Sequence, residues 1–479
     1  MLYASVDKSQ LYSGIIAEKG IWGLWILWVS MISVAVVPLV FAPLWAKLNF
    51  ITDNQFILFR FSGQGARILH QFRAVYVGGL VVSFILSFQT IAFSRILQVY
   101  YNISLEKSIL ITGGLLSLFS LKNSFANKFK NDIFHSILYF LSLGISFYFL
   151  YKNSGGLTHA INQIKINSPN TLFVLPPKDN TSLWYSLFVY LGIQWWSSST
   201  FDGGGPEMSR YTATGTRLGA IKTGLAHLIL ELPVIGILII MSLLSFAKSN
   251  FANNGELEFV KSVFETTPKS FSTIILLGFF ALFITSSESI LNWGASFLTV
   301  DFYKKHLVKN KTEKHYIFIS FLSMLVLSFL SMIIALYINS LDLLIKIIFS
   351  ISAGVAPVFI LRWFWMRINA WSQISAMISS GIYTLLFFVF EYYNPSFFND
   401  LTLQGHEWRI IIVTILTSIT WIIITFFTKK DDKETINKFF KILPPKHEII
   451  KSFILALLIG ISIILFLGVS TYLIYNCVF

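Results

Sequence analysis

The sequence predicts an all-α polytopic membrane protein. Hydrophobic residues make up 55% of the 479 positions and charged residues only 12%, which is about half the charged fraction of an ordinary soluble domain. The mean hydropathy of +0.69 agrees with this composition. Apolar segments of about 20 residues, the length of a helix that crosses a bilayer, recur along the whole chain. The sequence lacks the short alternating segments of a membrane β-barrel.

In chain order, residues 1–20 are too short and too polar to cross a membrane, and a series of apolar segments follows them. Each segment is bounded by charged or turn-forming residues, so each is predicted to be one helix. The predicted membrane-spanning helices are 21–47, 68–99, 108–122, 132–151, 183–200, 217–246, 270–299, 315–337, 342–366, 373–392, 408–427 and 449–475.

Lysine and arginine are concentrated in alternate connections between these helices. The connection 393–407 has Asp400 and Glu407 but neither lysine nor arginine, and 338–341 has no basic residue. Basic loops face the cytoplasm, so the protein is expected in the cytoplasmic (inner) membrane with its C-terminus outside. The net charge of +13 is therefore assigned to cytoplasmic loops and not to nucleic-acid binding. The basic connections are 47–73, 122–130, 210–217, 304–314, 362–367 and 429–446.

Residues 193–210 (IQWWSSSTFDGGGPEMSR) interrupt one of the predicted helices. Glycine frees the backbone, and Pro206 removes a donor and clashes with the preceding turn, so the helix must open here. Such a break is tolerated at membrane depth only where the freed N–H and C=O groups face protein or a wet cavity. The segment therefore indicates a discontinuous helix at a transport site. The alternative is a helix end with interfacial tryptophans.

A second polar cluster, residues 285–289 (TSSES), lies inside the predicted helix 270–299. Hydroxyl and carbonyl oxygens are the hard ligands that a small alkali cation prefers. One or two such hydroxyls could simply bond back to their own helix, but four beside a carboxylate exceed that expectation. Glu288 is costly in lipid and must face the interior or a partner. It could hold a proton, help to coordinate a cation, or pair with Lys346, and these three possibilities stay open.

Two further polar pairs lie within predicted helices. His227 and Glu231 stand four residues apart and so share one helix face, as residues 132 and 135 nearly do. A structural hydrogen bond is favoured for each pair over a proton relay. The sequence shows no metal-ligand spacing, phosphate loop or catalytic nucleophile motif, so it predicts no enzyme. The single cysteine, Cys477, excludes an internal disulfide.

Three stretches together resemble the sodium:solute symporter family, and the resemblance runs over nearly the whole chain. They are 194–210, 291–304 (LNWGASFLTVDFYK) and 360–372 (ILRWFWMRINAWS), the first looking most like bacterial members. The resemblance implies a leucine-transporter-like core of five plus five helices in inverted repeat, with core helices 1 and 6 unwound. Residues 1–479 would form one transporter domain, with the core in 1–366 and additional helices in 373–475.

The resemblance also implies a sodium site between broken helix 1 and core helix 8. Thr285 and Ser286 match the paired hydroxyls of the helix-8 motif, and a carbonyl ligand is expected near Leu282. The helix-1 carbonyls would fall at Met1 and Ala4.

On the substrate side, the resemblance makes Asp7 the acidic residue of broken helix 1. Gln194, Trp195, Trp196 and Ser197, at the break in core helix 6, are the other expected substrate contacts. An amide can orient hydroxyl or carboxyl groups, and indole faces pack against rings or cations. The alternative for the tryptophans is helix packing.

The beginning of the chain departs from the family pattern. Lys8 stands where many relatives have a neutral residue, so its side chain is expected to point away from sodium. The family has a further helix and the first half of broken helix 1 before this point, so either the start lies upstream or this is a truncated product.

The expected function is sodium-coupled symport of a small organic solute by alternating access. The solute would be a sugar, polyol, amino acid or carboxylate; sodium is the coupling ion, no other cofactor is expected, and lipids are the only other partner. The alternatives are a non-transporting receptor, an inactive truncated fragment or, third, a channel.

Overall fold

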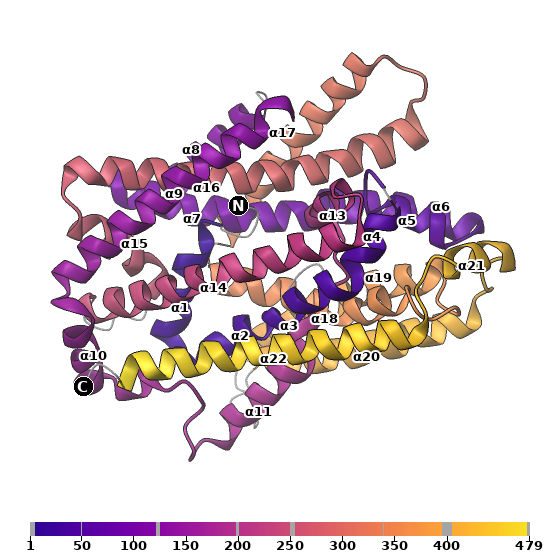
Figure 1. Ribbon diagram of the computed structural model, residues 1–479. Coiled ribbons are helices and arrows are strands. Elements are labelled where there is room, and N and C mark those ends of the chain that lie inside the picture. The colour runs from indigo at the N-terminus through magenta and orange to yellow at the C-terminus, as the bar shows by residue number, and fades with distance from the viewer. Residues whose placement is uncertain are drawn as a thin grey trace.

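The computed structural model describes residues 5–48, 50–120, 125–197, 201–249, 254–338, 340–394 and 405–476. Within these ranges all regular structure is helical. The long helices lie roughly alongside one another, with α10 and α15 at one end of the molecule and α5, α6, α13 and α21 at the other (Figure 1). The helices are α1 Asp7–Lys19, η1 Ile21–Leu24, α2 Trp25–Trp28, α3 Ser30–Val36, η2 Val37–Phe41, α4 Ala42–Leu48, α5 Gln55–Arg60, α6 Gly63–Val75, η3 Tyr76–Val81, α7 Val82–Tyr101, α8 Leu105–Ser120, α9 Phe125–Asn153, α10 Gly156–Asn167, η4 Pro169–Leu172, α11 Thr181–Val189, η5 Tyr190–Gln194, α12 Trp195–Ser197, η6 Gly205–Glu207, α13 Met208–Ala213, α14 Arg217–Lys248, α15 Gly255–Thr266, α16 Lys269–Ser296, η7 Phe297–Leu307, α17 Glu313–Tyr337, α18 Leu341–Leu361, α19 Ala370–Tyr393, α20 Gly405–Phe427, α21 Lys433–Phe440 and α22 Lys446–Asn476.

Ten helical segments in the described part of the chain are long and apolar enough to cross a membrane, which confirms a multi-pass protein. They coincide with ten of the twelve predicted spans. The other two predicted spans, 108–122 and 183–200, correspond to α8 and to the α11–η5–α12 segment. Both of these helices end at residues outside the described ranges, so their full lengths are not compared with the prediction.

Two of the spans are longer than the sequence predicts. Gly63–Tyr101 and Lys269–Leu307 each run for 39 residues, or about 58 Å at 1.5 Å per residue. A bilayer core is only about 30 Å thick, so both helices project beyond it. They cross where Gly78 meets Gly294: a Cβ on Gly294 would lie 2.9 Å from the Gly78 carbonyl oxygen. These two small residues let the backbones approach closely and fix α16 against η3 and α7.

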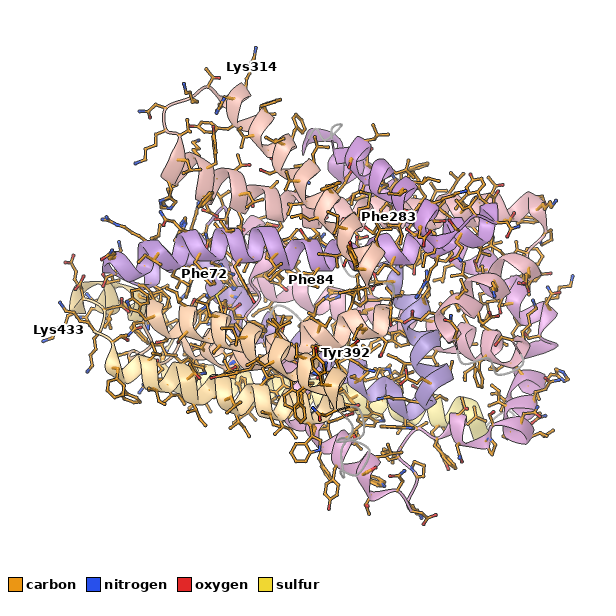
Figure 2. The ribbon with its side chains drawn as sticks, turned by 180° about the vertical axis from the view of Figure 1, so that it is seen from behind. Phe72, Phe84, Phe283, Lys314, Tyr392 and Lys433 are labelled. Carbon is orange, nitrogen blue, oxygen red and sulfur yellow. The ribbon has the colours of Figure 1, made fainter. Side chains whose placement is uncertain are left out.

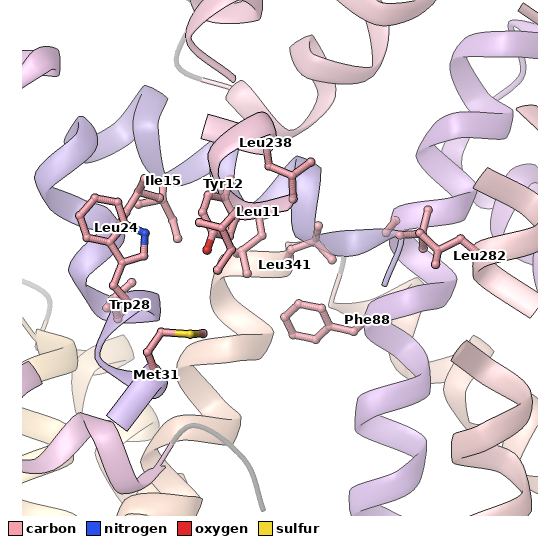
Figure 3. Packing of buried hydrophobic residues seen from close by; sticks show 14 of the residues in the cluster. Leu11, Tyr12, Ile15, Leu24, Trp28, Met31, Phe88, Leu238, Leu282 and Leu341 are labelled. Atoms are coloured by element: carbon pink, nitrogen blue, oxygen red, sulfur yellow. The ribbon is translucent and has the colours of Figure 1, made fainter. Parts of the chain in front are cut away.

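Helix α1 is short but lies deep in the molecule. Most of its 13 residues are buried, and it packs against α14, α15, α7 and α18. Figure 3 shows Leu11 and Tyr12 of α1 beside Leu238 of α14. At its other side α1 meets the start of α15, where a Cβ on Gly255 would lie 2.3 Å from the Ser13 carbonyl oxygen. The polar N-terminal segment is therefore part of the core although it is too short to cross a membrane.

Two of the basic loops lie at the same end of the molecule. Lys314 and Lys433 project from the same end in Figure 2, the end that holds α5, α6 and α21 in Figure 1. The connection that holds Glu256 and α15 lies at the opposite end. This arrangement agrees with the alternation of basic and less basic loops read from the sequence.

Candidate functional site

The predicted break in residues 193–210 is present. Helix α12 is described as far as Ser197, residues 201–204 are not helical, and α13 begins only at Met208. The turn η5, directly before α12, is a π-helical turn. Gly203 and Gly205 have φ angles of +71° and +81°, a region that residues with a Cβ rarely adopt. Local π-helix and left-handed glycines explain why this helix does not continue. Single π turns inside helices are frequent at functional sites.

Trp195 and Trp196, at the end of this helix, pack edge to face with ring centroids 5.4 Å apart. The Trp196 indole N–H donates to the Ala353 carbonyl oxygen of α18 at 3.4 Å, and the Ser33 hydroxyl of α3 donates to the Trp195 carbonyl oxygen. These two hydrogen bonds therefore connect the broken helix to α18 and to α3. This contact agrees with the packing alternative for Trp196, and both tryptophans are half-buried.

Gln194 is the most unusual of the predicted substrate residues. Its side chain is completely buried, and neither its amide nitrogen nor its amide oxygen has a hydrogen-bond partner in the described part of the protein. Ser197, which is also fully buried, donates to the Gln194 main-chain carbonyl at 2.8 Å and leaves the side chain unsatisfied. An orphaned buried polar group costs about 1–3 kcal/mol, so the Gln194 amide needs a water or a polar ligand.

The predicted cation residues of α16 lie together and are buried. Ser286 donates to the Leu282 carbonyl oxygen at 2.8 Å and to the Gln89 amide oxygen of α7 at 3.1 Å. The Thr285 hydroxyl lies 2.6 Å from Nδ1 of His135 on α9. The Ser286 hydroxyl, the Leu282 carbonyl and the Gln89 amide oxygen lie together, with Thr285 adjacent in the helix. These oxygens have the ligand chemistry that suits a small hard cation. No cluster of three or more His, Cys, Asp or Glu among the described residues could hold a metal ion.

Two neighbours of this cluster were not identified from the sequence. Gln89 accepts from both Ser286 and Ser287, the second at 2.5 Å. An amide inside an apolar helix was the only available signal for it. His135 contacts Thr285, whereas the sequence had suggested only a local structural bond for it. Met1 and Ala4, the predicted helix-1 ligands, lie outside the described residues.

At the start of α1, Asp7 is half-buried as the first residue of the helix, and the adjacent Lys8 reaches α14. The Lys8 ammonium donates to Oε1 of Glu231, and Nε2 of His227 lies 2.9 Å from Oε2 of the same carboxylate. His227 and Glu231 are therefore in contact, as their shared helix face predicts, and Lys8 is a third member that the sequence did not assign. Lys346, which the sequence offered as a partner for Glu288, forms an ion pair with Asp342, one turn earlier on α18.

A buried network lies just beyond the break, toward the basic end. Asp202 accepts from the Arg362 guanidinium at 2.5 Å and from the Trp363 indole at 2.9 Å, while the Trp45 indole donates to its main-chain oxygen at 2.6 Å. All four side chains are almost completely buried. Arg362 and Trp363 belong to one of the stretches that carry the family resemblance, so the structure supplies a physical role for that stretch.

The opposite end is closed by α15. Glu256 accepts from the Arg95 guanidinium of α7 and from the Asp342 main-chain N–H of α18 at 3.2 Å. A cavity of about 730 Å³ opens beside α15 and includes Lys261, Lys269 and Tyr100, but none of the predicted site residues. We therefore place the candidate site at the break and on α16, not in this cavity.

The family model for the sodium:solute symporter family matches residues 11–380, well over half of the chain. The chain belongs to the sodium:solute symporter family. It is therefore a member of a family of sodium-coupled solute transporters and not of an enzyme family. The family match includes the break, the α16 cluster and the Asp202–Arg362 network.

Two relatives place the chain within the family. The osmoregulated proline transporter OpuE of Bacillus subtilis is 26% identical over 167 residues, which span 34% of this chain but only 32% of that protein. A solved structure of a Na⁺-coupled sialic acid symporter in its substrate-bound outward-open state superposes with a TM-score of 0.64. It is 15% identical, and the alignment covers 89% of this chain and 88% of that chain. The structural match shows a shared symporter fold.

Proposed function

We propose that this symporter-family chain moves a small organic solute together with sodium across the cytoplasmic membrane by alternating access. The observation that carries the proposal is the oxygen cluster of Leu282, Thr285 and Ser286, buried at the middle of the long helix α16. Most of the proposed substrate residues lie at the break in residues 193–210, where the buried Gln194 amide has no hydrogen-bond partner among the described residues. Alternating access then exposes both sites to one side of the membrane at a time.

The finer architecture belongs to the same proposal. The α11–α13 segment would be broken core helix 6, α16 core helix 8 and α1 the second half of core helix 1, in a leucine-transporter-like inverted repeat. Met1 and Ala4 stay the proposed helix-1 ligands of sodium. Asp7, Trp195, Trp196 and Ser197 stay proposed substrate residues beside Gln194. The basic loops would face the cytoplasm, because lysine and arginine crowd alternate connections.

The test is sodium-driven uptake into proteoliposomes, with a panel of sugars, polyols, amino acids and carboxylates as solutes. The double variant Thr285→Ala/Ser286→Ala removes two proposed sodium ligands. It should raise the sodium concentration for half-maximal uptake at least about tenfold, equivalent to about 1.4 kcal/mol.

The matched control is Ser328→Ala/Ser331→Ala, which removes two buried α17 hydroxyls bonded to their own helix at 2.9 and 2.8 Å. It should leave the sodium dependence unchanged. An unchanged sodium dependence in the Thr285/Ser286 variant, with normal folding, would refute the assigned cation site.

A further inference from the structure

An ion pair within the membrane domain joins α1 to α14. Lys8 donates to Glu231, and His227 lies one turn before Glu231 on the same face of α14, 2.9 Å from its second carboxylate oxygen. The side chains of Lys8, Glu231 and His227 are 28%, 9% and 13% exposed. Part of the Lys8 side chain is therefore accessible, while the carboxylate it contacts is almost wholly buried.

The pair lies on a helix that is long and apolar enough to cross a membrane. Glu231 is near the middle of this 32-residue helix α14, far from both of its ends. Lys8 is the second residue of α1, directly after Asp7, where this short helix begins. Leu11 and Tyr12, one turn further along α1, pack beside Leu238 of α14, so the two helices are in contact around the pair (Figure 3). Solute sites of secondary transporters lie near the bilayer midplane, which is where the middle of a spanning helix is expected.

An enclosed ion pair is poor evidence for a purely stabilising role. Well-packed apolar side chains in place of a buried pair are often as stable or more stable. Ionisable residues inside membrane helices instead mark solute or ion pathways by default. A pair of opposite charges is also complementary to a molecule that carries one positive and one negative charge.

We propose that Lys8 and Glu231 form the recognition site for a zwitterionic solute, an amino or imino acid. In this site the solute carboxylate binds the Lys8 ammonium, and the solute ammonium binds the Glu231 carboxylate. His227 keeps that carboxylate in position. This inference rests on the proposed function and names its substrate class. Neither charge is left uncompensated when such a solute separates the pair.

Other solute classes fit these residues less well. A sugar or polyol offers no charge to either group, so separating the pair would leave two enclosed charges unpaired. A simple carboxylate would satisfy Lys8 but leave Glu231 without its cation. Asp7, directly before Lys8 in α1, adds one further carboxyl group next to the pair.

The experiment is sodium-driven uptake of the common amino acids, proline included, alongside glucose and myo-inositol. The best amino acid is then compared with its amide, which lacks the carboxylate, and its N-acetyl derivative, which lacks the ammonium. In the unmodified protein both derivatives should compete at least tenfold more weakly than the parent amino acid. Lys8→Met should bring the amide and the parent to within about twofold, and Glu231→Gln should do the same for the N-acetyl derivative.

A second variant distinguishes recognition of the solute from a role of the ion pair in holding α1 against α14. Lys8→Met/Glu231→Leu removes both charges together and keeps the contact apolar, so the protein should fold and still bind sodium, but its amino-acid uptake should be lost. Lys248→Met/Glu265→Gln removes an exposed pair with a 3.1 Å separation and should change nothing.

Unimpaired amino-acid uptake by the doubly apolar variant would overturn the proposed recognition. Sodium-driven uptake of glucose or inositol without any amino acid would also overturn it, while leaving the proposed symport intact. Absence of sodium-driven uptake for every solute tested would overturn the proposed function itself.

Discussion

Asp202→Asn is the substitution that best tests how the region after the break is held. Asp202 has the same size as asparagine, so the change removes charge with little change in shape. In the protein its carboxylate accepts from Arg362 at 2.5 Å and from the Trp363 indole at 2.9 Å. Arg362 is completely buried, and Asp202 is 3% exposed. The variant therefore leaves a buried guanidinium without its counter-charge.

Removing one partner of a buried ion pair costs about 3–5 kcal/mol, because the other charge stays desolvated. The conformation that contains the ion pair should therefore fall in population by roughly 10²- to 10⁴-fold relative to conformations in which Arg362 reaches water. The Trp45 bond to the Asp202 main-chain oxygen survives, so the local backbone is retained. The loss is thus expected in the equilibrium between conformations as well as in overall stability.

The assay is thermal unfolding in detergent, followed by tryptophan fluorescence, together with hydrogen exchange of residues 201–213. Asp202→Asn should lower the unfolding temperature and speed exchange in this segment. Asp179→Asn, the same change at an exposed carboxylate, is the control. An Asp202→Asn protein that unfolds and exchanges like the control would show that the pair does not hold the broken helix.

Three further changes test other contacts. Gly255→Ala places a Cβ 2.3 Å from a main-chain oxygen of α1 and should lower the unfolding temperature, whereas Gly236→Ala, with nothing within 4 Å, should not. Glu256→Gln deprives Arg95 of its counter-charge and should speed hydrogen exchange in α15; unchanged exchange would contradict a role in holding this helix. Burial raises the pKa of Asp431 above 3.8, so the folded state keeps a proton that the unfolded chain has lost. Stability should therefore fall as pH rises from 3.8 through the raised pKa, and Asp431→Asn should flatten the unfolding temperature over that window.

The sequence predicted the elements whose physics is local. Apolar length located the spans, and the glycines and proline after Ser197 located the break, because backbone freedom and a missing donor act within a few residues. The polar cluster 285–289 was recognisable because four hydroxyls and a carboxylate interrupt an apolar helix, whereas the resemblance to the family singled out 285 and 286. Contacts between distant segments were not predictable: Gln89 meets Ser286 across 197 positions and Lys8 meets Glu231 across 223. Such contacts depend on how whole helices cross, as at Gly78 and Gly294, which no local pattern encodes.

Helix α1 contacts both α14, through Lys8, and α15, through Gly14. On one side Lys8 is held by Glu231 of α14, and on the other Gly14 lies so close to Glu256 of α15 that a Cβ would be 2.6 Å from its Cγ. A ligand shifts a conformational equilibrium only through contacts that differ between the two states. A solute that takes Lys8 from Glu231 changes one of the contacts that hold α1, while the contact with α15 remains. We therefore expect solute binding at the proposed site to be coupled to the packing of α15 through α1. Glu256→Gln, which loosens α15, should then weaken solute binding although Glu256 does not contact the solute.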